Sequence, residues 1–340
     1  MTEYLAWYRK YRPQTFDQVV GQTHIVSVLK QAVTAGTPRQ AYLFIGSRGT
    51  GKTSIARILA KTLQVADKDI IEIDAASNTG VDDIRALQED IYSLPFASSY
   101  KVYIIDEAHM LSKSAFNALL KTLEEPPSHV IFILATTEAE KMPETVKSRC
   151  ETHIFRQPTA LELKTVISQT AKAEKLKLPT GADDLIAELA NGSFRDALGL
   201  LQQVAADKKI TLAEIQELTG APGIELLNKL AQALLDNDSS TAIDLINQAR
   251  QSQVDIRLLT KLLTQLIRQA TLYSLTKNTI PDDRWFSPET VKNLANNPRQ
   301  KYLPAILKML VRAWDNQAWL FDPGLPLELV VLEIAEQDNK

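Results

Sequence analysis

The chain has 340 residues, of which 45% are apolar and 23% charged, so it can bury a core and divide into two or three domains. This composition excludes a disordered chain, a collagen-like repeat and a small disulfide scaffold. The single cysteine, Cys150, cannot form an internal disulfide, and with four scattered histidines it cannot build a four-ligand zinc site. We therefore expect neither redox nor zinc chemistry.

The charge balance and the hydropathy pattern limit the possible partners. The 38 basic and 41 acidic residues give a net charge of -3, so no global positive field indicates nucleic acid, and any DNA contact must be local. No apolar run approaches the ~20 residues that a bilayer span needs. The first four residues also lack the charged and then apolar pattern of a signal segment. We expect a soluble, cytoplasmic protein with no membrane partner.

Five short apolar runs, separated by helical patterns, predict a parallel sheet with crossover helices in the first part of the chain. The runs cover residues 42–45, 70–73, 102–105, 130–134 and 153–155. Because polar residues hardly interrupt them, we expect a sheet that is buried on both faces.

After Gln157 and Pro158, Leu, Ala, Gln and Glu dominate with helical spacing, so the rest of the chain is expected to be all-helical. Gly220-Ala221-Pro222-Gly223 is the strongest candidate boundary inside it. The sequence thus predicts three domains: an α/β domain in residues 1–157, a small helical domain in residues 158–220 and a larger all-α domain in residues 221–340.

A glycine-rich loop follows the first apolar run directly and precedes a helical pattern. Its residues are Gly46, Ser47, Arg48, Gly49, Thr50, Gly51, Lys52 and Thr53. This is GxxxxGKT in a strand-loop-helix context, which predicts a nucleoside triphosphate held by backbone N–H groups. Lys52 would reach the β- and γ-phosphates and Thr53 would bind Mg²⁺. The alternative is a glycine-rich turn with no ligand.

The third run ends in Asp106 and Glu107, at the carboxyl edge of the predicted sheet, where α/β proteins bind ligands. Asp106 would hold Mg²⁺ through water, and Glu107 would orient and deprotonate an attacking water molecule. The alternative is a pair of acids that cap the next helix. His109 is expected to pack or couple rather than catalyse, because Glu107 already supplies the base.

Further segments resemble the AAA+ clamp loaders and, within them, the bacterial DNA polymerase III gamma/tau family, and the likeness extends over about residues 4–206. Two segments, residues 71–77 and 116–127, resemble gamma/tau specifically. The others resemble general clamp-loader motifs. Residues 8–13 together with 16–22 resemble the amino-terminal box, and residues 135–137 resemble sensor 1. Residues 148–150 resemble the SRC motif, and residues 192–198 resemble sensor 2. The resemblance implies that the three domains are an AAA+ nucleotide-binding domain, a lid and an oligomerisation collar.

This resemblance implies roles for residues outside the loop. Thr137 would hydrogen-bond the attacking water or the γ-phosphate, and Arg195 would touch the phosphates from the lid. Arg149 would reach the nucleotide of a neighbouring subunit as an arginine finger; the alternative is a surface ion pair. The base of ATP would lie against four residues of the amino-terminal segment: Arg12, Pro13, Val19 and Val20.

The implied function is that of the ATPase subunit of a bacterial clamp loader, which opens a sliding clamp and loads it on primer-template DNA. Implied cofactors are ATP and Mg²⁺, and implied partners are delta, delta-prime and further gamma copies, the sliding clamp and primer-template DNA. Candidate DNA contacts lie at helix starts, where plain helix caps are the alternative. They are Asn78, Thr79, Gly80, Ser112, Lys113 and Ser114.

Two departures from the family pattern stand out. The usual four-cysteine zinc module is missing, because residues 63–69 run straight into Ile70, so no zinc is expected. The sequence ends at Lys340 and resembles the shorter, gamma-like form or a truncated chain. Two other functions were weighed: a mainly structural ring subunit with incidental ATP turnover, and an AAA+ remodeller of another substrate such as a branch-migration motor. The intact phosphate loop counts against the first, and the gamma/tau-like segments count against the second.

Overall fold

A computed structural model of the chain describes residues 5–77, 90–205, 210–276, 286–316 and 322–337. The fold divides into two compact units. The first contains Met1–Leu176 and Ile186–Gln203, and the second contains Lys177–Leu185 and Val204–Lys340. The three-domain division at residues 157 and 220 stays a prediction.

The first unit contains a five-stranded sheet in which every neighbouring pair of strands is parallel, in the order β2-β3-β4-β1-β5. The strands are β1 (Ala41–Ile45), β2 (Ile70–Asp74), β3 (Lys101–Asp106), β4 (Val130–Thr136) and β5 (Glu151–Ile154). All five predicted strands are confirmed. The fifth begins earlier than its apolar run and ends before Phe155, because alternation of exposed and buried residues hides its first half from a search for apolar runs.

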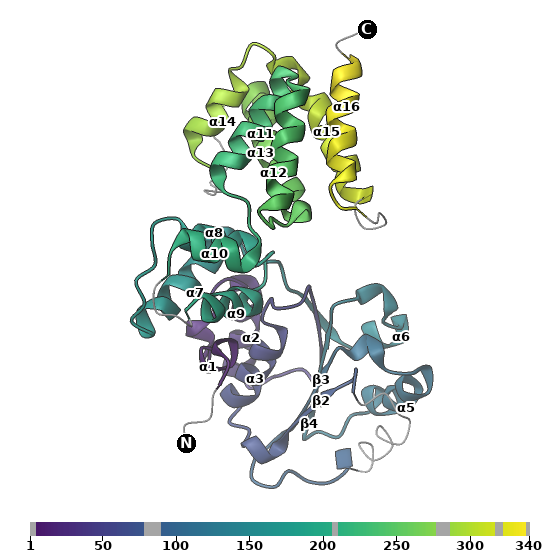
Figure 1. The fold of residues 1–340 in the computed structure, drawn as a ribbon. Coiled ribbons are helices and arrows are strands. Elements are labelled where there is room, and N and C mark those ends of the chain that lie inside the picture. The colour runs from purple at the N-terminus through teal and green to yellow at the C-terminus, as the bar shows by residue number, and fades with distance from the viewer. Residues whose placement is uncertain (1–4, 78–89, 206–209, 277–285, 317–321, 338–340) are drawn as a thin grey trace. The chain divides into compact units, whose positions relative to one another are not determined.

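Helices cover both faces of this sheet. Helices α2 (Thr23–Thr34) and α3 (Lys52–Thr62) lie on one face, and α5 (Lys113–Glu124) and α6 (Glu144–Lys147) lie on the other (Figure 1). The interior strands β1, β3 and β4 are therefore buried almost throughout. The expectation of two buried faces fails at the edge strands, where Ile154 of β5 is 67% exposed.

Alternate residues of the interior strands pack into the two cores, as a period of two requires. Leu43 packs on the α5 side, whereas its neighbours Tyr42 and Phe44 pack on the α3 side. On the α5 side, Phe132 of β4 is fully buried and stacks on Tyr103 of β3, with ring centroids 5.6 Å apart. These cores fix the ends of the strands, where the polar residues lie.

Helices account for the rest of the first unit, and the described residues that follow Phe155 contain no strand, which confirms the helical expectation. Besides the helices on the sheet, this unit has a short amino-terminal helix and three helices that come after the sheet in the chain. They are α1 (Trp7–Lys10), α7 (Ala160–Ala173), α8 (Ala182–Leu189) and α9 (Phe194–Val204), of which α8 is shared with the second unit.

The second unit consists mainly of seven helices among its described residues. They are α10 (Leu212–Thr219), α11 (Ile224–Asp236), α12 (Ser239–Gln251), α13 (Ile256–Thr276), α14 (Pro288–Ala295), α15 (Leu303–Asn316) and α16 (Leu325–Gln337). Within it, α13 packs against α11, α14 and α15, so that this helix forms the centre of the bundle. Across the described ranges, none of the helices has the length and apolar character that crossing a membrane requires.

We expect Phe132→Ala to lower the free energy of unfolding of the first unit by about 3–5 kcal/mol, because it removes a fully buried ring and leaves a cavity between β3 and β4. Calorimetric unfolding of the full chain measures the effect. Leu161→Ala is the control, since Leu161 is 73% exposed on α7 and should change the stability by no more than about 0.5 kcal/mol. Equal effects of the two substitutions would contradict the described core.

Candidate functional site

A cavity of about 550 Å³ lies in the first unit, at the carboxyl ends of β1 and β3. The phosphate loop, the amino-terminal segment and helices α7 and α9 line it. Most of the residues singled out in the sequence meet here: Arg12, Pro13, Val19, Val20, Arg48, Gly49, Thr50, Gly51, Lys52, Thr53, Asp106, Glu107 and Arg195. The cavity therefore gathers segments from five distant parts of the sequence.

Lys52 begins helix α3 and is only 6% exposed. Its Nζ donates to the carbonyl oxygens of Gly46, at 2.7 Å, and Ser47, at 3.0 Å. Gly46 and Ser47 themselves do not line the cavity but lie behind it. Burial lowers the pKa of the Lys52 ammonium, and the carboxylates of Glu107 and Asp106 oppose that shift. A desolvated cation at the floor of a cavity favours an anionic ligand.

Gly49 is the point where the loop meets the segment before α9. Its φ is +75°, and a Cβ at this position would lie 2.0 Å from Ser193 Oγ. The Phe194 N–H donates to the Gly49 carbonyl oxygen at 3.0 Å. Only glycine combines this backbone conformation with such a close approach. The loop and α9 are thus in direct contact, so a change in one must displace the other.

Thr53 and Asp106 lie together, since Thr53 Oγ1 donates to Asp106 Oδ2 at 2.6 Å. A hydroxyl and one carboxylate suit Mg²⁺, which takes oxygen ligands and completes its shell with water and substrate phosphates. The buried Ser47 Oγ has no hydrogen-bond partner within the described part of the chain, but Ser47 does not line the cavity. No three His, Cys, Asp or Glu side chains among the described residues form a metal-binding group, and the expectation of no zinc stays a prediction.

Glu107 follows β3 with a φ of +47°, in the left-handed region that side chains other than glycine rarely adopt. Its backbone N–H donates to Asp106 Oδ1 at 3.0 Å, and its Oε2 accepts a hydrogen bond from Thr137 Oγ1 at 3.0 Å. Thr137 does not line the cavity but reaches it through this contact. The carboxylate that faces the cavity is therefore held from the end of the neighbouring strand, β4.

Arg195 enters the cavity from the first turn of α9, where its guanidinium lies 4.7 Å from the centre of the Tyr8 ring. The amino-terminal segment is tied to the same helices, because Tyr11 Oη donates to Glu174 Oε1 at 2.6 Å and the Trp7 N–H donates to Gln202 Oε1 at 2.8 Å. The sequence did not single out Tyr8 or Glu174. Tyr8 stands in the amino-terminal box, whereas no sequence signal marks Glu174.

Arg149 lies apart from the cavity, just after α6. Its Nη2 donates to Glu124 Oε1 at 2.6 Å, and its Nη1 donates to the Thr145 carbonyl oxygen at 2.7 Å. Within the chain Arg149 thus forms the surface ion pair that was its alternative role. Arg149 does not line the cavity of its own chain. Its role in the site of a neighbouring subunit stays a prediction.

The candidate DNA contacts are placed only in part. Ser112 caps helix α5, and its Oγ accepts from the Ala115 N–H at 3.2 Å. Lys113 and Ser114 are in the first turn of that helix. The other three candidates, residues 78–80, lie outside the described residues. Capping by Ser112 fits the plainer alternative, and a DNA contact at this helix stays a prediction.

Curated relatives match nearly the whole chain. It is 37% identical to the DNA polymerase III subunit tau of Bacillus subtilis (strain 168), over 99% of this chain and 64% of that protein. It is 40% identical to the DNA polymerase III subunit gamma of Buchnera aphidicola subsp. Schizaphis graminum, over 71% of this chain and 72% of that protein. The chain spans from 39% to 64% of the first four curated relatives that it matches.

A family model described as "DNA polymerase III, delta subunit" matches residues 63–159. Among solved structures, the RuvB Holliday junction branch migration motor of Thermotoga maritima superposes with a TM-score of 0.53 and 24% identity, over 66% of this chain and 79% of that chain. At this identity the likeness shows the fold alone. Together with the sheet and the phosphate loop, it confirms the fold class expected from the sequence.

We expect Gly49→Ala to weaken nucleotide binding about tenfold or more, since the new methyl group must displace Ser193 and with it the loop. Titration of the full chain with ATP measures the change. Gly36→Ala is a matched control, because Gly36 also has a positive φ, +68°, but nothing lies within 4 Å of its Cβ position. Equal affinities of the two variants would show that the contact with Ser193 does not shape the loop.

Proposed function

Because the chain belongs to the family of DNA polymerase III gamma and tau subunits, we propose that it is the ATPase subunit of a bacterial clamp loader. In this role it uses ATP binding and hydrolysis to open a sliding clamp and to load it on primer-template DNA. The observation that supports the proposal most is the single cavity that gathers Lys52, Asp106, Glu107 and Arg195.

ATP fits this cavity with its triphosphate on the loop. Backbone N–H groups at the start of α3 face the phosphates, and the positive end of that helix favours their charge. The ammonium of Lys52 would exchange its carbonyl partners for β- and γ-phosphate oxygens. Thr53 and Asp106 would hold Mg²⁺, which neutralises charge on the same oxygens. The base would lie against Arg12, Pro13, Val19 and Val20.

Hydrolysis in this arrangement needs one proton transfer and one displacement. Glu107 takes a proton from a water molecule whose oxygen attacks the γ-phosphorus, while Thr137 holds the carboxylate in place. The bond from the γ-phosphorus to the bridging oxygen breaks, and ADP and phosphate result. Lys52 and Arg195 stabilise the negative charge that shifts to the leaving oxygen. Contact between Gly49 and Ser193 couples the state of the loop to α9.

The assembly that we propose follows from the family. Its members would be delta, delta-prime and further copies of this chain, held together by a collar in residues 221–340, with the lid in residues 158–220. Arg149 would leave Glu124 to reach the nucleotide of a neighbouring subunit. In this proposal the assembly acts in the cytoplasm, on the sliding clamp and on primer-template DNA. Intact Lys52 and Glu107 count against a merely structural ring subunit.

Steady-state ATP hydrolysis by the purified complex tests the proposal, measured with and without both a primed DNA junction and the sliding clamp from the same source. We expect strong stimulation only when both ligands are present, because loading couples hydrolysis to both. Bound ATP without stimulation would instead favour the structural role.

We expect Glu107→Gln to retain ATP and to slow its hydrolysis by about 10²- to 10⁴-fold, because the amide cannot accept the proton of the attacking water. Single-turnover hydrolysis and ATP affinity should be measured on the same preparation. Glu140→Gln is the control, since Glu140 is exposed on the surface of the same unit. Turnover at the wild-type rate in Glu107→Gln would remove this residue from the mechanism.

We expect Arg149→Ala to bind ATP normally and to hydrolyse it about 10³- to 10⁵-fold more slowly, as in hydrolases that lose an arginine finger. Mixing this variant with Lys52→Ala subunits should restore part of the activity, because each variant then supplies what its neighbour lacks. A pure Arg149→Ala assembly that is fully active would contradict a role in trans.

A further inference from the structure

His109 is a buried imidazole beside the candidate base, and its side chain is only 5% exposed. Nδ1 lies 3.0 Å from Thr136 Oγ1, and Nε2 lies 3.1 Å from Glu138 Oε1. The nearer carboxylate oxygen of Glu107 is 3.6 Å from Nδ1, which is too far for a hydrogen bond. His109 therefore touches Glu107 while both its ring nitrogens are engaged by the end of β4.

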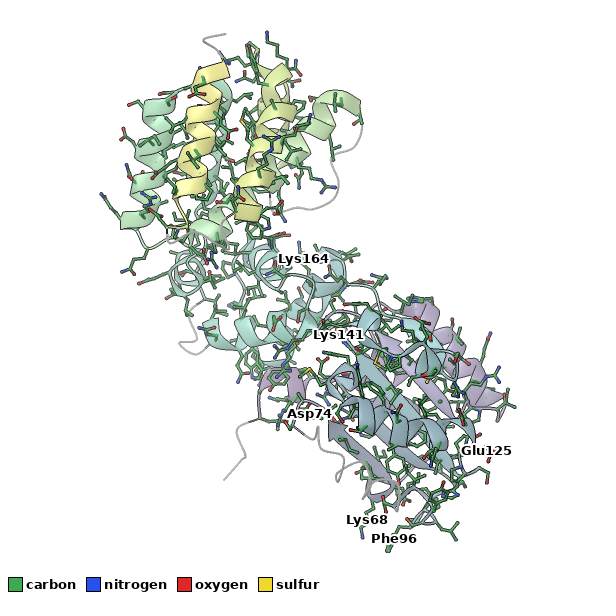
Figure 2. All side chains as sticks on the ribbon, turned by 90° about the vertical axis from the view of Figure 1, so that its right-hand side faces the viewer. Lys68, Asp74, Phe96, Glu125, Lys141 and Lys164 are labelled. Atoms are coloured by element: carbon green, nitrogen blue, oxygen red, sulfur yellow. The ribbon has the colours of Figure 1, made fainter. Side chains whose placement is uncertain are left out.

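The partners of the ring determine which nitrogen carries the proton. Glu138 lies between two nitrogen atoms, because its Oε2 pairs with Lys141 Nζ at 2.8 Å and its Oε1 is 3.1 Å from Nε2 of His109. Of these residues, Figure 2 labels Lys141. The hydrogen bond from Lys141 lowers the pKa of Glu138, so this carboxylate is ionised and only accepts. The proton of neutral His109 is therefore on Nε2.

Thr136 completes the series of hydrogen bonds on the other side of the His109 ring. Its Oγ1 already accepts the Glu138 N–H at 3.0 Å, so its own hydroxyl proton can be donated to Nδ1. In the Nε2–H form, His109 thus accepts from Thr136 and donates to Glu138, and every polar atom of the ring has a partner. In the opposite form, Nδ1–H would point at Thr136 and Glu107, and Nε2 would face a carboxylate without a proton between them.

The position of Glu107 depends on this arrangement. Glu107 caps the short helix η3 (Ala108–Met110), in which His109 is the central residue, and its own backbone is in the left-handed region. A strained conformation persists only where its surroundings hold it. The bonds from His109 to Thr136 and Glu138 hold this turn against β4. Because Nδ1 carries no proton in this form, the ring donates no hydrogen bond to Glu107, whose Oε2 accepts from Thr137 instead.

We propose that Glu138 fixes His109 as its Nε2–H tautomer, and that His109 in this form is a positioning residue for Glu107, which aims the carboxylate at the attacking water without donating a hydrogen bond to it. This inference rests on the proposed function, since ATP hydrolysis is what gives Glu107 a water molecule to activate. His109 and Glu138 act through Glu107 and touch neither the nucleotide nor the water.

The first measurement is nitrogen-15 NMR of the full chain labelled at its four histidines, with the His109 signals assigned by their absence in His109→Asn. We expect the proton on Nε2 at neutral pH in the wild type. A protonated Nδ1 in the neutral ring would overturn the proposal, because the ring would then donate toward Glu107.

The second measurement compares Glu138→Leu, which removes the acceptor, with Glu138→Gln, whose amide oxygen can still accept from Nε2. We expect Glu138→Leu to slow single-turnover ATP hydrolysis by about 10- to 100-fold with ATP affinity changed less than about threefold, and Glu138→Gln to restore most of the rate. Glu140→Leu is the matched control, because Glu140 is exposed and lies in the short helix η4 (Ala139–Lys141), whose N-cap is Glu138. Glu138→Ala replaces the Leu variant if that variant loses ATP binding.

A Glu138→Leu rate equal to that of Glu140→Leu would overturn the proposal, and so would a Glu138→Gln rate no faster than that of Glu138→Leu. Failure of the proposed function is distinguishable. A wild-type chain that hydrolyses ATP without stimulation by clamp and DNA fails as a clamp loader, whereas the contrast among the Glu138 variants still supports His109. A purified wild-type complex with no hydrolysis overturns both.

Discussion

A parallel sheet that is covered on both faces can place charged groups only where its strands end. In this chain β1, β3 and β4 are buried almost throughout, and the loop after β1, the two acids after β3 and the threonines of β4 come to one edge. The carboxylates of Asp106 and Glu107 and the ammonium of Lys52 are close together because the cores on either side leave them no other place. The chemistry of the site therefore follows from the packing of the strands.

The same edge also carries the contacts that join the sheet to its neighbours in the first unit. Ser193 lies against Gly49, and Arg195 lies over Tyr8. The first contact joins the phosphate loop to the residue before α9, and the second joins α9 to the amino-terminal segment. A nucleotide that fills the cavity must adjust to the loop, to α9 and to the amino-terminal segment at once. Binding of a nucleotide in the cavity can therefore affect the loop, α9 and the amino-terminal segment together.

Sequence patterns predicted the parts of the site that are contiguous in the chain. The phosphate loop and the acids at the end of β3 can be recognised from consecutive residues, and each adjoins an apolar run that predicts a strand. The strand order and the contact between Gly49 and Ser193 depend on packing between distant segments, which no local pattern encodes. The contact between His109 and Glu138 was not predicted for the same reason, since no sequence pattern marks the two residues as partners. The first residues of β5 were missed because an exposed edge strand alternates.

One contact in the phosphate loop has a consequence for selectivity. An ammonium has three protons, and Lys52 already gives hydrogen bonds to the carbonyl oxygens of Gly46 and Ser47. One proton is left for an arriving anion, and each further hydrogen bond from Lys52 to that anion takes a carbonyl's charged partner away in a buried setting. A single weakly charged oxygen returns less than the two carbonyls give up, whereas adjacent phosphates supply several charged oxygens together. The resting loop thus favours a ligand with several adjacent charged oxygens over a small anion with one.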